Sequence, residues 1–212
     1  MEDVTTQGAS AQAATRETIL KRATHSFATR GYTATTMRAI AEQAGIEVGS
    51  IYHHFPSKEA LVACVMEQGA DNIVQHVVAR LDRLPSGANA EARLRAAIVG
   101  QMTGLIAFGD VALAHARLMT QLPESVRARL VERREQHQRL WHGLLDDLRA
   151  QGLLRADIDM SLCRVFLLAC INSVQNWYDV SKGPLEEAAN EICTMLLDGV
   201  NASCVPGGDL DA

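Results

Sequence analysis

Four hydrogen-bonding side chains lie close together in the first third of the chain, at Ser50, Tyr52, His53 and His54. Each can donate a hydrogen bond to a phosphate oxygen or to the edge of a DNA base. Basic side chains flank the group at Arg38 and Lys58 and add charge that a phosphate would attract. These residue types at this spacing could therefore recognise a nucleic acid.

Two short helices joined at a glycine would position these side chains. We expect the first helix over 37–44, capped by Thr36, because apolar residues recur there at helical spacing. Gly45 permits a sharp turn, and a second helix follows over 48–54. Ile46 and Ile51 would pack inward and fix the angle between the helices. The pattern alone leaves two interpretations open, DNA recognition or an ordinary helix pair in a helical protein.

Composition predicts helices along the rest of the chain. Ala, Leu, Arg and Glu are abundant, and aromatic residues make up only 4% of the 212 residues. We expect further helices over 15–29, 57–84, 90–107, 110–121, 124–151, 160–181 and 185–202. Residues 1–14 and 203–212 are polar or small and are expected to be disordered.

The charge distribution sets the first segment apart. The chain has a net charge of −5, whereas residues 15–58 carry six Lys or Arg and three Glu, a local charge of +3. No apolar leader or membrane-spanning run is visible, and the five cysteines form no CxxC pair, which is typical of a cytoplasmic protein with reduced thiols. No nucleophile elbow, phosphate-binding loop or metal-ligand spacing is present, so we expect no enzyme activity, metal or cofactor.

The segment over 27–61, FATRGYTATTMRAIAEQAGIEVGSIYHHFPSKEAL, strongly resembles the N-terminal domain of the TetR (tetracycline repressor) family. The elements FATRGY, TTMRAIAEQAG, GSIYHHF and SKEAL occur in order and at family spacing. The resemblance implies that the DNA contacts are Thr36, Arg38, Val48, Gly49, Ser50, Tyr52, His53, His54 and Lys58. Thr36 and Arg38 would touch the DNA backbone, and Lys58 would meet a phosphate. Glu47 departs from the Ser or Thr of many members, which puts a backbone contact at that position in doubt.

The family resemblance also implies an architecture and a function. The fold would be all-α, with a three-helix helix-turn-helix domain over 15–60 joined through a long helix to a ligand-binding and dimerisation domain over 61–202. A homodimer would repress transcription from a palindromic double-stranded DNA operator until a small-molecule effector releases it. The run from LPESVRARL at residue 122, with NWYD and GPLEEAANEICTMLLDGV, resembles a branch that often responds to acyl-CoA thioesters. The alternative is a DNA-binding dimer without a small-molecule ligand.

Candidate residues for the second domain form two sets. The ligand set is Met102, Phe108, His115, Met119, Trp141, Leu145, Phe166 and Asn172, and its apolar members could equally be core. The dimer set is Val165, Ala169, Ser173, Trp177, Ile192, Met195 and Leu196. These residues lie on the last two expected helices, which would form a four-helix interface with the same helices of a second chain. Five arginines over 127–139 would be either a solvated face paired with glutamates or a docking surface for a CoA phosphate.

Overall fold

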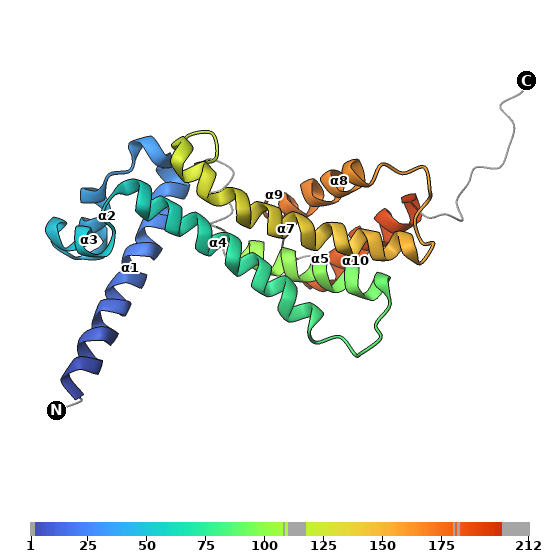
Figure 1. The fold of residues 1–212 in the computed structure, drawn as a ribbon, viewed down its shortest axis with the longest axis horizontal. Helices are drawn as coiled ribbons and strands as arrows, with labels where there is room; N and C mark the ends of the chain where they lie inside the picture. Colours follow the sequence, from blue (N-terminus) through green and yellow to red (C-terminus); the bar gives the residue numbers. More distant parts are fainter. Residues whose placement is uncertain (1–2, 108, 110–117, 180, 182, 201–212) are drawn as a thin grey trace, which may run out of the picture. The chain divides into compact units, whose positions relative to one another are not determined.

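The computed structural model describes residues 3–107, 109, 118–179, 181 and 183–200, and within these ranges its regular structure is helical, without a strand. The helices are α1 (Asp3–Ala34), α2 (Met37–Ala44), α3 (Val48–His54), α4 (Lys58–Leu81), α5 (Ala90–Ala107), α7 (Glu124–Ala150), α8 (Met160–Asn172), α9 (Val174–Trp177) and α10 (Leu185–Val200) (Figure 1). The predicted all-α fold is confirmed. Most of the helix expected over 110–121 and the tail over 203–212 lie outside the described residues.

The chain divides into two compact units. Among the described residues, 3–71, 109 and 118–134 belong to the first unit, and the remainder belong to the second. The long helices α4 and α7 continue without interruption through this division, so each supplies residues to both units. The boundary expected after residue 60 therefore falls too early and omits a segment that is distant in sequence. No described helix is long and apolar enough to span a membrane.

The distant segment belongs to the first unit because it completes that unit's core. Leucine and valine side chains at helical spacing are buried there, at Leu118, Leu122, Val126 and Leu130. They share one apolar cluster with Phe27 of α1, Ile40 of α2 and Ile51 of α3. Burial of a large aliphatic side chain contributes about 1.5–3 kcal/mol, so this cluster is a substantial part of the unit's stability.

Helix α1 begins earlier than expected and is interrupted at Gly31. Residues 3–14, predicted to be disordered, are helical, which is consistent with the high helix propensity of the alanines in this stretch. We expected Thr15 to cap a helix beginning there, but it lies inside α1, and its hydroxyl donates to the Ala11 carbonyl at 2.9 Å. Gly31 has φ 78° and ψ 174°, so the helix is broken there, two residues after the end expected at residue 29.

The helix expected over 160–181 is divided at Ser173. Helix α8 ends at Asn172, and α9 is a single turn from Val174 to Trp177. The Ser173 hydroxyl donates to the Cys170 carbonyl at 2.8 Å and accepts a hydrogen bond from Nε1 of Trp177 at 3.1 Å. A serine side chain that bonds to the preceding turn competes with the backbone and bends a helix, which the apolar periodicity does not reveal.

Helix α5 is the centre of the second unit and packs against α8, α9 and α10. Two glycines let its backbone approach the last part of α4. A Cβ at Gly100 would lie 2.7 Å from the His76 carbonyl oxygen, and one at Gly104 would lie 3.2 Å from the Ile73 Cα. Gly100 therefore requires the absence of a side chain for this close packing, whereas a Cβ at Gly104 would be a tight contact.

The four described cysteines, Cys64, Cys163, Cys170 and Cys193, are free thiols. Burial raises the pKa of the Cys163 thiol and raises that of Cys193 to about 11. Because the thiolate is the reactive form, the buried pair stays protonated and inert, as expected for structural cysteines.

Candidate nucleic-acid interface

The turn between α2 and α3 is set by local backbone chemistry. The Thr36 Oγ1 accepts a hydrogen bond from the Ala39 N–H at 3.2 Å and caps α2. Gly45 ends the helix in the left-handed conformation, with φ 69°, and its N–H bonds to the Glu42 carbonyl at 3.2 Å. The Ile46 N–H bonds to the Ala41 carbonyl at 3.1 Å, which completes the C-cap. The turn is therefore specified by residues within a few positions of each other.

Helix α3 has one anchored face and one open face. Ile51 is fully buried, Phe55 follows it into the core, and Ile46 packs against the same cluster. Tyr52 is 49% exposed, and Val48 and His53 are also exposed. A Cβ added at Gly49 would meet nothing within 4 Å, whereas Ser50 and His54 are half-buried. The predicted contact residues of α3 are thus held on a rigid element with their polar groups near the surface.

The two residues predicted to contact the DNA backbone are also exposed. Thr36 is exposed, although its hydroxyl oxygen already caps α2. Arg38 is exposed, and its Nε donates to Oε1 of Glu42 one turn later at 3.0 Å. An exposed pair of this kind is weak, so Arg38 can exchange its carboxylate partner for a phosphate. The side chain of Glu47, at the N-cap of α3, makes no capping hydrogen bond.

Lys58, the predicted phosphate contact, makes hydrogen bonds within its own chain. Its Nζ donates to the Tyr32 carbonyl at 2.7 Å and to the Thr35 carbonyl at 2.8 Å, and it lies 4.2 Å from the Tyr32 ring centroid. Burial lowers the pKa of Lys58. Two of its three N–H donors are therefore used inside the protein. The lysine joins the start of α4 to the end of α1.

Tyr32, which contacts Lys58, was not among the residues predicted from the sequence. Its hydroxyl donates to Oε1 of Glu59 at 2.9 Å, and its ring stacks on Phe27. Burial, followed by the bond to Glu59, raises the pKa of Tyr32 to about 12. Its position in the FATRGY element could have identified it as a structural residue. The Tyr32 N–H donates to Gln121, which is 89 positions away and lies in no recognised motif.

The predicted ligand residues are not brought together as one set. Met102, Trp141 and Leu145 are fully buried in the second unit, whereas Met119 packs against the core of the first. Phe166 is 68% exposed, so it does not line an interior cavity of this chain. Asn172 is exposed, and Phe108 and His115 lie outside the described residues.

A group of hydrogen-bonding side chains links α5, α7 and α8 in the second unit, with Trp141 buried, His137 half-buried and Asn172 exposed. Gln101 is buried, and its Nε2 donates to Oδ1 of Asn172 at 3.0 Å. Nε2 of His137 lies 3.1 Å from both Oε1 of Gln101 and Nε1 of Trp141. Sequence reasoning noted Asn172 and Trp141 but missed Gln101 and His137. In any one tautomer, Nε2 of His137 either donates to Gln101 or accepts from Trp141, so these side chains link α5, α7 and α8 without forming one continuous hydrogen-bonded chain.

Arginines of α7 form ion pairs with carboxylates, as in the first of the two interpretations of this stretch. Arg129 donates to Glu67 at 3.0 Å, and Arg133 makes a two-point contact with Asp71 through Nε at 2.8 Å and Nη2 at 3.2 Å. Arg127 pairs with Glu124, and Arg139 with Glu135. The partners are partly those expected and partly carboxylates of α4. Arg127, Arg129, Arg133 and Arg139 are therefore paired with carboxylates in this chain.

Most of the predicted dimer residues are exposed in the single chain. Val165 and Met195 are 54% and 73% exposed, Trp177 and Ala169 are exposed, and Ser173 and Ile192 are half-buried. Leu196 is the exception, because its side chain is buried within its own chain. Phe166 and Leu162 extend the same exposed apolar face of α8. Exposed apolar faces of this size are typical of interaction surfaces.

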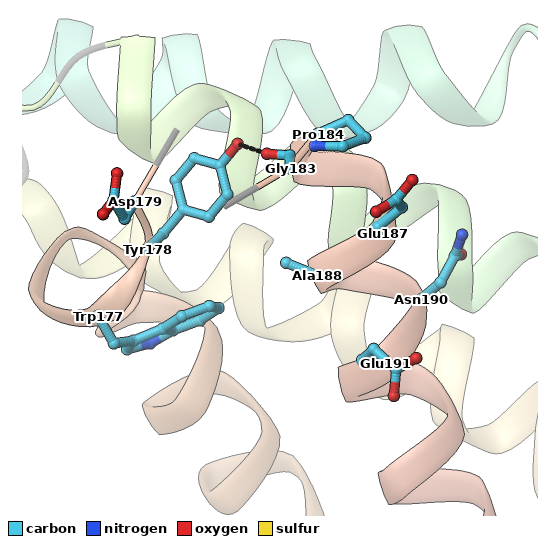
Figure 2. Close-up of a pocket in the computed structure, with 9 residues that line it drawn as sticks. All are labelled: Trp177, Tyr178, Asp179, Gly183, Pro184, Glu187, Ala188, Asn190 and Glu191. Atoms are coloured by element: carbon cyan, nitrogen blue, oxygen red, sulfur yellow. Dashed lines mark hydrogen bonds between the residues drawn. The ribbon is translucent and has the colours of Figure 1, made fainter. Parts of the chain in front are cut away.

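An open pocket of about 560 Å³ lies between the segment after α9 and the start of α10 (Figure 2). Its lining includes the rings of Trp177 and Tyr178 and the carboxylates of Asp179, Glu187 and Glu191. The Tyr178 hydroxyl donates to the Gly183 carbonyl at 3.0 Å and ties the loop to α10. None of the predicted ligand residues that the structure describes lines this pocket.

A capped helix, a glycine turn and an anchored second helix with polar side chains outward define a helix-turn-helix DNA-binding protein. Residues 19–65 match the family described as "Bacterial regulatory proteins, tetR family", and residues 87–200 match "Tetracyclin repressor-like, C-terminal domain". The chain belongs to the TetR family. It is a DNA-binding transcriptional regulator and not an enzyme.

Full-length relatives agree with this assignment. The chain is 31% identical over 202 residues to the HTH-type transcriptional repressor KstR2 of Mycolicibacterium smegmatis, covering 90% of this chain and 93% of the relative. The solved structure of the ketosteroid transcriptional regulator KstR2 of Mycobacterium tuberculosis superposes with a TM-score of 0.74 at 26% identity, covering 88% and 94%. The fatty acid degradation regulator FadR of Bacillus halodurans, at 21% identity and a TM-score of 0.71 over 87% and 95%, shares the fold.

The accessible basic residues imply a salt-dependent complex. We expect the logarithm of operator affinity to fall with the logarithm of salt concentration, with a slope of about −0.9 for each phosphate neutralised. Arg38→Ala should make this slope shallower by about 2 per dimer, because one contact is lost in each protomer. Fluorescence anisotropy from low to physiological salt measures it. Arg139→Ala, an exposed arginine of α7, is the control, and a flat response of the parent protein would contradict phosphate-anchored binding.

Proposed function

We propose that the protein is a homodimeric repressor that binds a palindromic operator and is released by a small hydrophobic effector. The observation that carries the proposal is the open polar face of α3 on a rigidly anchored helix. Relatives that match over nine-tenths of their length are named repressors, which supports repression rather than activation.

Dimerisation follows from the small reach of one recognition helix. One α3 reads only a few base pairs, so two must act together on half-sites about 34–36 Å apart. The exposed apolar residues of α8, with Met195 of α10, supply a surface on which a second copy can pack. Repression would then result from occupation of promoter DNA by the dimer.

The release mechanism rests on helix continuity. Helices α4 and α7 each run from one unit into the other, so a ligand that repacks the second unit acts on elements of the first. A ligand changes DNA affinity only if it binds two arrangements of the dimer unequally, and the coupling is reciprocal. The contact between buried Gln101 and half-buried His137 supports this mechanism, because it places polar groups that could orient a ligand beside the apolar core of the second unit.

For the effector we propose an amphipathic lipid metabolite, with acyl-CoA thioesters and ring-containing carboxylates as candidate classes. The ketosteroid regulator among the relatives supports inclusion of steroid-derived compounds. The paired arginines of α7 offer no ready CoA-phosphate site, so the acyl part would supply most of the affinity.

Operator selection followed by titration tests the function. A palindromic duplex is first selected in vitro from a random-sequence pool. Acyl-CoA thioesters, steroid carboxylates and free ketosteroids are then titrated against the complex, with free CoA as control. We expect at least one compound to raise the operator Kd about tenfold or more, which is typical of allosteric coupling. If compounds bind the dimer without shifting the complex, or none binds, a ligand-independent DNA-binding dimer is the better account.

A further inference from the structure

The break at Gly31 leaves the backbone of Tyr32 in need of partners outside α1. Because Gly31 leaves the helical conformation, the Tyr32 N–H cannot continue the regular helical ladder. The side chain of Gln121 replaces that partner, with its Oε1 accepting the Tyr32 N–H at 3.0 Å. A Cβ on Gly31 would lie 2.9 Å from the same oxygen, so the amide is seated directly on the turn.

The other side of the same turn is tied to the start of α4. Lys58 donates to the carbonyls of Tyr32 and Thr35, and Glu59 accepts the Tyr32 hydroxyl. Lys58 follows the end of α3 by four residues. Tyr32 thus connects Gln121 to the residues that immediately follow the recognition helix.

Gln121 is exposed, but it lies in a segment that is anchored to the core of the first unit. Its N–H bonds to the Leu118 carbonyl at 2.7 Å, and both Leu118 and the adjacent Leu122 are buried in the cluster that contains Ile51. The residues that follow lead into α7, whose second half belongs to the other unit. Gln121 therefore lies in a segment that the sequence analysis assigned to the ligand-binding domain but that the structure places in the first unit, with the helix-turn-helix.

We propose that Gln121 is a positioning residue for DNA recognition, which holds the Gly31–Tyr32 turn and, through Tyr32 and Lys58, sets the orientation of α3. The inference rests on the proposed function and adds a residue far outside the helix-turn-helix segment. Gln121 acts through hydrogen bonding at the turn and makes no contact with DNA in this scheme. Its loss would leave phosphate attraction intact and impair the fit of α3 to bases.

The test compares Gln121→Leu, which keeps the side-chain size but removes the acceptor, with Gln121→Glu, which keeps an acceptor oxygen. Gln68→Leu, at an exposed glutamine of α4, is the matched control. Affinities are measured for the selected palindrome and for a scrambled duplex. We expect Gln121→Leu to lose about tenfold in affinity for the palindrome and little for the scrambled duplex, and Gln121→Glu to keep most of the specificity ratio. A purely structural role would instead lower the Tm and leave that ratio unchanged.

Amide hydrogen exchange at Tyr32, followed by NMR in the DNA-free parent protein, tests the contact itself. We expect slow exchange in the parent and Gln121→Glu proteins and fast exchange in Gln121→Leu. A folded Gln121→Leu dimer that binds the palindrome within about twofold of the parent would overturn the proposal. Should that variant not fold, an unprotected Tyr32 amide in the parent would overturn it equally, and protection would support it. A parent protein that selects no duplex would instead refute the proposed function, so the two failures are distinguishable.

Discussion

The Ala169→Glu variant is expected to sediment as a monomer at micromolar concentration, whereas the parent protein sediments as a dimer. Ala169 is exposed on α8 between the large exposed side chains of Phe166 and Val165 and the half-buried Ser173. A second copy packed on this face would bury the new carboxylate without a partner, which costs several kcal/mol. Analytical ultracentrifugation measures the change.

The exposure of Ala169 also predicts that the variant chain keeps its own fold. Its helical content by circular dichroism should match the parent, because the new side chain meets solvent in the isolated chain. Operator affinity should fall at least about a hundredfold, since a monomer engages one half-site and loses the gain from linkage. Ala79→Glu, at an exposed alanine of α4, should remain dimeric. A fully dimeric Ala169→Glu protein would show that the interface lies elsewhere.

Tyr52→Ala is expected to produce the second-largest effect, a loss of operator affinity with stability and dimerisation retained. A lost base or phosphate contact costs about 1–3 kcal/mol, and the dimer loses two, which corresponds to at least about thirtyfold. Tyr52 is 49% exposed, so its removal creates no core cavity and should leave the Tm nearly unchanged. Anisotropy titration of the selected duplex and a thermal melt test both statements.

His54→Ala should weaken operator binding in the same direction but less, because His54 is half-buried and presents less of its ring. His142→Ala, at a half-buried histidine of α7, is the matched control and should bind the operator as the parent does. Equal affinity of Tyr52→Ala, His54→Ala and parent would mean that α3 does not read the operator.

The helix-turn-helix could be predicted because its determinants are local. Thr36 and the Ala39 N–H, or Gly45 and the Glu42 carbonyl, lie within three positions of each other. Such interactions depend on residue type and spacing alone, so capping and glycine rules locate them. The buried face of α2 and the exposure of Tyr52 follow from the same helical period.

The predicted contacts in the second domain were less accurate because they depend on which helix packs on which. Periodicity identifies an apolar face but does not say whether its own chain or a second copy covers it. Leu196 and Phe166 illustrate the difference, since the former faces its own core and the latter faces outward. The single helix expected over 160–181 was wrong because one serine hydroxyl bonds back to the preceding turn.

By itself the sequence determined the class of protein, the element that reads DNA and the residues on its open face, since all of these follow from short-range rules and a specific motif. Only the tertiary structure decided that Lys58 points inward to two carbonyls and that residues 118–134 complete the DNA-reading unit. The contact between Gln121 and Tyr32 likewise joins residues 89 positions apart. Such pairings arise from three-dimensional packing, in which an unsatisfied N–H or a charged amine takes whichever partner the fold brings near.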